Sequence, residues 1–461
     1  MSDDLARLSA TALLELYRTH QASPVEVARA VMARIDRYNP VFNAFCFLNE
    51  SLVEDAKASE SRWLSGQPKG LLDGVPVSIK DLVLTKGWPT LRGSKALDPK
   101  GPWPDDAPAT ARLREHGALL IGKTTTPEFG WKGVTDSALT GITRNPWNKD
   151  KTPGGSSGGA VAAVAAGMGP LAVGTDGGGS IRIPCSFTGL FGIKPSFGRV
   201  PAWPASPFGT VAHVGPITRD VGDAALMLNV MSLPDARDWH ALPYDPRDWR
   251  TGLDRGVKDL RIAFSPNLGY AKVDGEVASL VRKAVSVFET LGASVEEKDP
   301  GFENAEPIFR THWFAGAAAL LRGIPKEKHA LLDAGLREVA AEGDRLSAAE
   351  VLDAQMKRSV LGAHMNLFHR DYDLLVTPTL AVAAFEAGRE MPAGMTRWMD
   401  WTPFTFPFNL TQQPAASIPC GFTEAGLPVG LHIVGPRYAD GLVLQAARAF
   451  ESVHPVKLPA L

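Results

Sequence analysis

The sequence predicts an α/β fold in which strands and helices alternate. Two observations carry this prediction: short apolar runs of strand length recur along the chain, and segments with apolar residues at helical spacing lie between them. The chain has 461 residues, of which 44% are hydrophobic. It can therefore bury a core large enough for one big α/β domain with insertions, or for two domains.

The N-terminal part is expected to be helical. Apolar residues recur at helical spacing over residues 8–38. Within this stretch Ser23 and Pro24 are typical of a helix start, with the serine as N-cap and the proline in the first turn, so we expect two helices. A further amphipathic stretch over residues 52–64 predicts another helix.

Strands and helices alternate most clearly in the next part of the chain. Apolar runs at 75–79, 119–123 and 171–175 predict buried strands, and the stretches 110–116 and 157–166 predict helices between them. The first strand ends at Lys80, and the third leads into a turn of three glycines closed by Ser180. Later segments predict helices over 280–291 and 350–368 and strands over 415–420 and 429–434.

Composition excludes several classes of protein. The formal net charge is −2 and no long basic run occurs, which argues against nucleic-acid binding. The longest apolar run, 158–174, contains a proline and is shorter than the ~20 strongly apolar residues of a membrane span. The first residues are acidic where a signal peptide is basic. Three widely spaced cysteines form no metal-ligand cluster and indicate free thiols in a reducing compartment, so we expect a cytoplasmic protein.

Two glycine-rich clusters, at 154–159 and 177–180, need a physical reason, because ordering glycine costs more backbone entropy than ordering any other residue. A flexible linker does not fit, since the first cluster leads directly into a helix. Neither cluster ends in the Gly-Lys-Ser or Gly-Lys-Thr of a phosphate-binding loop. Residues 154–158 do satisfy GxSxG, but no strand precedes them, and neither His213, His364 nor His432 has a recognisable triad context.

The second cluster has the features of a catalytic turn. Consecutive backbone N–H groups without side chains can converge on a developing oxyanion, and Ser180 would place its hydroxyl beside them. A serine hydroxyl needs a base to lose its proton. A lysine can be that base if burial keeps it neutral.

Long segments around these clusters resemble the amidase signature family. The resemblance covers most of the chain except roughly residues 235–400. The order and length of the motifs make it far more specific than a short pattern. The matching segments are 72–84 (LDGVPVSIKDLVL), 144–147 (RNPW), 154–159 (GGSSGG), 171–196 (LAVGTDGGGSIRIPCSFTGLFGIKPS), 215–219 (GPITR), 409–421 (NLTQQPAASIPCG) and 426–435 (GLPVGLHIVG).

The resemblance implies a large central mixed β-sheet covered by helices on both faces, and an acyl-enzyme mechanism that needs no metal or organic cofactor. Ser180 maps onto the nucleophile, Ser156 onto a bridging serine after a cis peptide bond at Gly155–Ser156, and Lys80 onto the base. The backbone N–H groups of Gly177, Gly178 and Gly179 map onto the oxyanion hole.

Residues near the catalytic groups are expected to have supporting or substrate-binding roles. Ser157 is expected to be a helix N-cap, and Asp176 and Arg182 are expected to brace the loop behind the nucleophile. The aromatic and methionine-rich segment 391–408 either caps the active site or packs in the core. The residues expected to contact substrate are Gly155, Trp131, Thr135, Trp398 and Trp401.

The family includes hydrolases of amides, anilides, hydrazides, carbamates and oligoamides, and the glutaminase subunit of a tRNA-dependent amidotransferase. That subunit usually continues after the signature with an Arg-Tyr pair, where this chain has Arg199-Val200, so a stand-alone hydrolase of a small amide is expected. A catalytically silent partner protein and the amidotransferase subunit remain alternatives. We expect a helical segment over 1–65 packed on a signature domain over 66–461, with a variable, mainly helical insertion at 235–400, in a monomer or homodimer.

Overall fold

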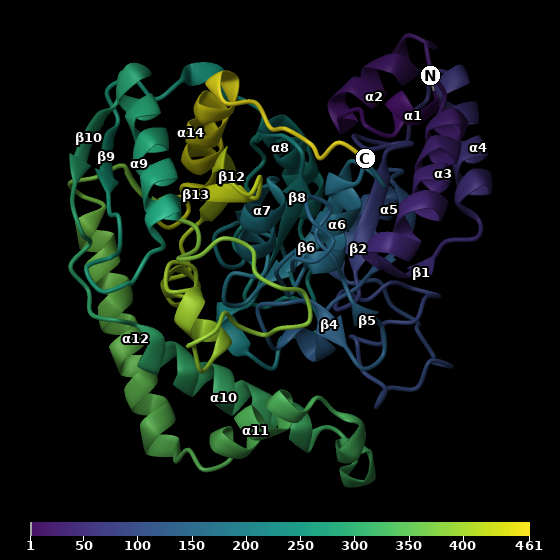
Figure 1. The fold of residues 1–461 in the computed structure, drawn as a ribbon. Helices are drawn as coiled ribbons and strands as arrows, with labels where there is room; N and C mark the ends of the chain where they lie inside the picture. Colours follow the sequence, from purple (N-terminus) through teal and green to yellow (C-terminus); the bar gives the residue numbers. More distant parts are fainter. Residues whose placement is uncertain (1) are drawn as a thin grey trace.

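Eleven strands hydrogen-bond into one sheet in the computed structural model, which describes residues 2–461 (Figure 1). A separate two-stranded ladder is formed by β4 (Asp136–Ser137) and β5 (Gly141–Ile142). Across the large sheet the strands lie in the order β1 (Phe45–Leu48), β3 (Leu119–Thr124), β2 (Pro76–Lys80), β6 (Leu171–Asp176), β8 (His213–Thr218), β7 (Phe191–Lys194), β12 (Ala415–Phe422), β13 (Pro428–Val434), β11 (Leu374–Pro378), β9 (Arg261–Phe264) and β10 (Ser294–Glu297).

The sheet is mixed, as expected. β3, β2 and β6 are parallel to one another, as are β11, β9 and β10. The strands between these two groups pair in antiparallel fashion, from β6 through β8, β7, β12 and β13 to β11. Because parallel neighbours end at the same edge of a sheet, the C-terminal ends of β2 and β6 lie side by side.

Helices cover both faces of this sheet. Side chains alternate between the two faces of a strand, and on β6 Leu171 and Val173 join the core cluster that contains α8, whereas Ala172 joins the cluster that contains α6. The helices are α1 (Ser2–Leu5), α2 (Ala10–Arg18), α3 (Pro24–Phe42), α4 (Leu52–Leu64), α5 (Pro108–Glu115), α6 (Gly158–Ala165), α7 (Arg182–Thr188), α8 (Val221–Met231), α9 (Gly275–Thr290), α10 (Glu306–Arg322), α11 (Ala334–Gly343), α12 (Ala348–Phe368), α13 (Pro407–Leu410) and α14 (Asp440–Val453), with short 3₁₀ turns η1 (Glu128–Gly130), η2 (Gly209–Val211), η3 (Leu253–Arg255), η4 (Lys326–Leu331) and η5 (Trp398–Trp401).

Local signals explain where the N-terminal helices begin. Ser23 is the N-cap of α3, with Pro24 as its first residue, and a reciprocal pair of hydrogen bonds with Glu26 completes a capping box. α4 spans the residues of the predicted amphipathic stretch, 52–64. Residues 1–65 also supply β1, which pairs with β3, so this segment adds a strand as well as helices to the body of the protein. The division at residue 66 stays a prediction.

The stretch 235–400 has two kinds of structure. α10, α11 and α12 form a helical lobe, drawn in green at the lower left of Figure 1, away from the N-terminal helices. The same stretch supplies β9, β10 and β11, three strands of the large sheet. Within residues 2–461 no helix combines the length and the apolar composition needed to cross a bilayer.

Candidate active site

The site begins at the edge where β2 and β6 end. All five residues of β2 are buried, and the last of them is Lys80. β6 ends at Asp176, and the glycine turn that closes at Ser180 follows directly. Because the two strands are parallel neighbours, the lysine and the turn meet although they are far apart in the sequence.

Lys80 is fully buried and contacts hydroxyl groups rather than carboxylates. Its Nζ lies 2.8 Å from Ser156 Oγ, 2.9 Å from Ser157 Oγ and 2.8 Å from Thr175 Oγ1. Burial lowers the pKa of Lys80 well below its ordinary value, against the opposing effect of the negative charge of Asp176. The surroundings therefore favour an uncharged amine.

Ser156 follows a cis peptide bond from Gly155, as expected from the resemblance. No side chain fits at Gly155, since a Cβ there would lie 2.5 Å from the carbonyl oxygen of Val134. Thr135 braces the same loop, because its hydroxyl donates to the carbonyl of Gly154 (2.9 Å) and accepts from the N–H of Gly158 (3.1 Å). The loop that carries Ser156 is thus held by Val134 and Thr135, the two residues that precede β4.

The hydroxyl of Ser157 does not have the expected capping role. The residue occupies the N-cap position of α6, but its hydroxyl makes no capping hydrogen bond. The hydroxyl instead lies against Lys80 and donates to the carbonyl oxygen of Thr175 (3.2 Å). Ser157 and Thr175 are therefore part of the lysine's immediate surroundings, which the sequence did not indicate.

The glycine turn is shaped by bulky neighbours. A Cβ at Gly177 would lie 2.9 Å from the ring of Trp313, and one at Gly178 would lie 2.7 Å from Phe309 and 3.0 Å from Trp398. The N–H of Gly179 donates to Asp176 Oδ1 (2.8 Å), whereas the N–H groups of Gly177 and Gly178 have no acceptor among the described residues. Glycine is required at these two positions because the aromatic rings leave no room for a side chain.

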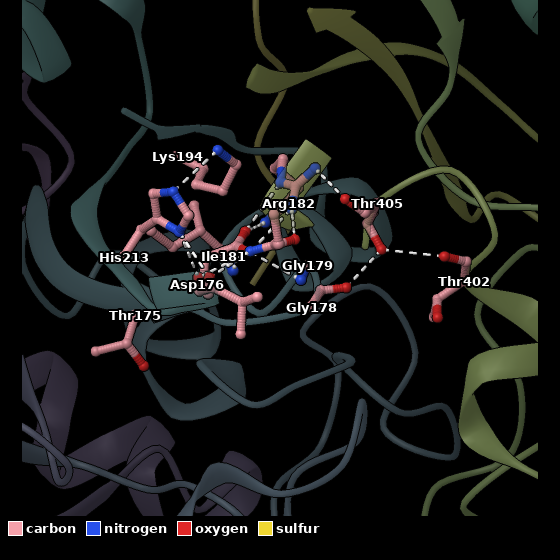
Figure 2. A network of polar contacts seen from close by, with 12 residues as sticks. Thr175, Asp176, Gly178, Gly179, Ile181, Arg182, Lys194, His213, Thr402 and Thr405 are labelled. Atoms are coloured by element: carbon pink, nitrogen blue, oxygen red, sulfur yellow. Dashed lines mark hydrogen bonds and ion pairs between the residues drawn. The ribbon is translucent and has the colours of Figure 1, made fainter. Parts of the chain in front are cut away.

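Behind the turn lies a buried polar network (Figure 2). Arg182 holds the Asp176 carboxylate with two hydrogen bonds of 2.9 Å each, and both side chains are fully buried. Burial alone would raise the pKa of Asp176, but the charge and hydrogen bonds of Arg182 keep it well below its usual range. Arg182 also donates to the carbonyl of Thr405 (2.9 Å), whose hydroxyl donates to the carbonyl of Gly178 (2.6 Å). Asp176 and Arg182 thus anchor the turn from behind.

Ser180 and Ser156 line one cavity of about 340 Å³. The side chains are 7% and 2% exposed, and the N–H of Ser157 donates to the carbonyl of Ser180 (3.2 Å). No hydrogen bond joins the two hydroxyls themselves among the contacts of residues 2–461. Lys80 and Ser156 are therefore in direct contact, and Ser180 lines the same cavity as Ser156.

Loops outside the catalytic motifs form much of the cavity wall. Residues 196–214 and 237–240 form much of it, with Leu82, Phe129 and Trp313 from other parts of the chain. His213 also lines it, and burial lowers the pKa of this imidazole well below its ordinary value. These loops are rich in proline and aromatic residues, which gave no strand or helix periodicity to read.

The residues expected to contact substrate do not line this cavity. Trp398 packs edge-on against Trp313 and Phe309 behind the glycine turn, and Trp401 stacks on Phe187. Trp131 is buried, and its carbonyl accepts from the indole N–H of Trp313 (3.0 Å). A role in substrate binding stays a prediction for these three tryptophans, and for Gly155 and Thr135. The described residues contain no group of three or more side chains placed to hold a metal ion.

Comparisons with known proteins show what the whole chain is similar to. The family model described as Amidase matches residues 26–444. An acylamidase of Rhodococcus erythropolis is 40% identical over 458 residues, covering 97% of this chain and 96% of that protein. One component of the glutamyl-tRNA(Gln) amidotransferase of Symbiobacterium thermophilum is 34% identical, and the match covers 98% of this chain and 99% of that one. The crystal structure of a bacterial aryl acylamidase of the amidase signature family superposes with a TM-score of 0.91 at 34% identity, covering 97% of this chain and 96% of that chain.

Proposed function

The chain is a member of the amidase signature family, and from that membership we propose that it is an amidase that hydrolyses the C–N bond of a carboxamide, an anilide or a related acyl derivative such as a carbamate. The observation that carries the proposal is the contact of 2.8 Å between the buried Lys80 Nζ and the Oγ of Ser156, which lines the same cavity as Ser180. We assign Lys80 as the base, Ser156 as the proton relay and Ser180 as the nucleophile.

The contacts of Lys80 support a neutral amine that acts as a base. A neutral amine has two N–H donors and one lone pair. The Ser157 hydroxyl gives its proton to the carbonyl of Thr175, so its oxygen is left to accept from Lys80. Thr175 Oγ1 can accept the second proton, which leaves the lone pair directed at the Ser156 hydroxyl. This arrangement makes Ser156 the group through which the lysine acts.

The reaction then proceeds through a covalent acyl-enzyme. Ser180 attacks the acyl carbon while its proton passes to Ser156, which gives its own proton to Lys80. We assign stabilisation of the oxyanion to the unpaired N–H groups of Gly177 and Gly178. The N–H of Gly179, which the resemblance also assigned to the oxyanion hole, donates to Asp176 Oδ1 and so holds the turn instead. Ser156 returns the proton to the leaving nitrogen, the C–N bond breaks, and water attacks the acyl-enzyme to release the acid.

The cavity favours a substrate with an apolar or aromatic part. Its wall includes Phe129, Trp203, Phe208 and Trp313, and aromatic walls of this kind bind flat apolar groups. The two acylamidases among the relatives are named for an acyl amide and, in one case, an aryl acyl amide. We infer a small-molecule amide substrate, bound without nucleic acid, in a cytoplasmic enzyme that acts as a monomer or homodimer.

A second candidate is a glutaminase-type subunit of a tRNA-dependent amidotransferase. The observation in its favour is the 34% identity to a component of such an enzyme over almost the whole of both chains. The identity to the acylamidase is higher, at 40% over a similar span, and we therefore place hydrolysis by the chain alone first.

The test is hydrolysis of a panel containing a primary amide, an aryl anilide, an aryl carbamate, an ester and glutamine by the purified chain alone. Ser180→Ala is compared with wild type, and Ser286→Ala, at an exposed serine of α9, is the matched control. We expect amine release by wild type and Ser286→Ala but not by Ser180→Ala. Full activity of Ser180→Ala would refute the nucleophile, and hydrolysis of glutamine alone would favour the amidotransferase role.

A further inference from the structure

An arginine without a partner stands in the wall of the cavity. We propose that Arg92 binds a carboxylate of the substrate, so that this chain hydrolyses amides whose acyl or amine part carries a carboxylate. The proposal rests on the amidase function proposed above and names the substrate class of the same site.

The backbone of Arg92 is held by residues that adjoin the catalytic groups. Asp81, which directly follows Lys80, accepts a hydrogen bond from the N–H of Gly93 (3.3 Å). The carbonyl of Arg92 accepts from the N–H of Phe129 (2.7 Å). The next residue, Gly130, lies so close to Ser156 that a Cβ there would be 3.1 Å from the serine Oγ. The backbone around Arg92 is thus hydrogen-bonded to Asp81, which follows the catalytic lysine, and to Phe129, which precedes the residue next to Ser156.

Arg92 also adopts an unusual backbone conformation. Its φ is 54°, and that of Phe129 is 51°, in the left-handed region that residues other than glycine seldom occupy. Of the eight described non-glycine residues with positive φ, these are the two that line the cavity. Strained residues of this kind concentrate where a side chain must be presented in one particular place.

The guanidinium of Arg92 makes no hydrogen bond and no ion pair with any residue from 2 to 461. Burial lowers the pKa of Arg92, while the Asp81 carboxylate opposes this from a distance. That carboxylate is already occupied by backbone N–H groups, including that of Gly93, and by Lys123 at 4.0 Å. Arg92 is only partly buried, so its guanidinium, which is unpaired among the described residues, is open to an anionic group of a ligand that enters the cavity.

The other charged groups of the wall are already satisfied. Arg237 holds Asp235 with hydrogen bonds of 2.9 and 2.7 Å and lies over the ring of Trp203. Asp238 accepts from two backbone N–H groups, and Asp176 is bound by Arg182. Arg92 is therefore the cavity-lining arginine that is free to bind a ligand.

A carboxylate fits this position better than other groups. The planar guanidinium donates two parallel hydrogen bonds that match the two oxygens of a carboxylate. The apolar and aromatic remainder of the wall would hold the body of the substrate, and the arginine would fix its charged end. Binding of the charged end would set the distance between the carboxylate and the scissile bond.

The experiment compares kcat/KM for two matched pairs of anilides. For a charge on the amine part, the pair is para-acetamidobenzoate and para-nitroacetanilide, in which the neutral nitro group has the shape of a carboxylate. For a charge on the acyl part, the pair is N-phenylsuccinamate and butyranilide. Each pair is measured with wild type, Arg92→Gln, Arg92→Lys and Arg282→Gln, at an exposed, ion-paired arginine of α9 outside the cavity, so that differences in intrinsic reactivity cancel in the ratio between enzymes.

We expect the preference for the charged member of one pair to fall about 10- to 100-fold in Arg92→Gln, the range for a charge-assisted hydrogen-bonded pair. Arg92→Lys should retain part of the preference. Arg282→Gln should leave the ratio within about threefold of wild type, since an exposed surface ion pair outside the cavity contributes little. A ratio that stays unchanged in Arg92→Gln for both pairs would overturn the proposal.

A binding measurement separates this proposal from the proposed function. Titration calorimetry with para-acetamidobenzoate and N-phenylsuccinamate uses Ser180→Ala with and without Arg92→Gln, at low and high salt. If wild type cleaves no amide, the amidase function fails, yet salt-sensitive binding that needs Arg92 would still support the carboxylate site. Equal binding of both compounds with and without Arg92 would refute the site even in an active amidase.

Discussion

Replacing Lys80 by methionine should separate activity from stability. Methionine has a similar length and no charge, and Lys80 has no carboxylate in contact that would be left unpaired. The change removes hydrogen bonds to three hydroxyls, each worth about 0.5–1.5 kcal/mol net, and also removes a buried amine that is costly to desolvate. We therefore expect unfolding free energies within about 2 kcal/mol of wild type at neutral pH. Activity should fall by about 10²–10⁴-fold or more, because the base is gone.

The same substitution tests the protonation of the lysine. In the unfolded chain Lys80 binds a proton below pH ~10.4, whereas in the folded protein its pKa is lowered well below that value. In the interval between the two pKa values the unfolded state holds one more proton, so wild-type stability rises with pH by about 1.4 kcal/mol per unit from this group. Lys80→Met lacks this contribution. The unfolding free energy of wild type minus that of Lys80→Met should therefore increase by that amount for each unit of rising pH.

The assay is urea unfolding of both proteins at pH 7, 8 and 9, with Lys149→Met at an exposed position as the control for loss of a lysine side chain. Activity against an anilide should show the matching behaviour in wild type: kcat/KM falls as pH drops through the lowered pKa of Lys80, since protonation removes the base. A difference in unfolding free energy that does not change with pH would show that folded Lys80 keeps its proton. The proposed relay would then be refuted.

Two further substitutions test the turn behind the nucleophile. Asp176→Asn breaks a fully buried ion pair and leaves the charge of Arg182 uncompensated, so urea unfolding should show a loss of about 3–5 kcal/mol, and a loss below 1 kcal/mol would contradict the pairing. Gly178→Ala places a Cβ 2.7 Å from Phe309, so the turn must shift. We expect about 1–3 kcal/mol of destabilisation together with a lower kcat. A wild-type kcat in a steady-state assay would show that the turn does not position the oxyanion.

The sequence predicted the parts of the fold whose signal is local. Helix start signals placed α3 at Pro24, and apolar runs located β2, β3 and β6 to within a residue or two. The short strands β9 and β10 were not predicted. Each has four residues that do not alternate between buried and exposed positions, so both are recognised as strands only by their neighbours in the sheet.

The candidate site shows the same limit. Lys80, Ser156 and Ser180 were picked out through the resemblance to a family, and the structure brings the first two into hydrogen-bond contact. Thr175 was expected only as the end of a strand, because nothing in its local sequence says that its hydroxyl meets a lysine from another strand. Arg92 gave no signal at all: its significance depends on the absence of a partner, which only the folded structure shows.

The central claim is that Ser180 forms the covalent intermediate, and the direct test is to trap it. The enzyme is mixed with para-nitrophenyl acetate, quenched in acid during turnover, and examined by intact mass and peptide mapping. An acetyl group on Ser180, absent from Ser180→Ala and accumulating more slowly in Lys80→Met, is the predicted result. An acetyl group on Ser156 or Ser157 instead, or turnover by Ser180→Ala at the wild-type rate, would contradict the account.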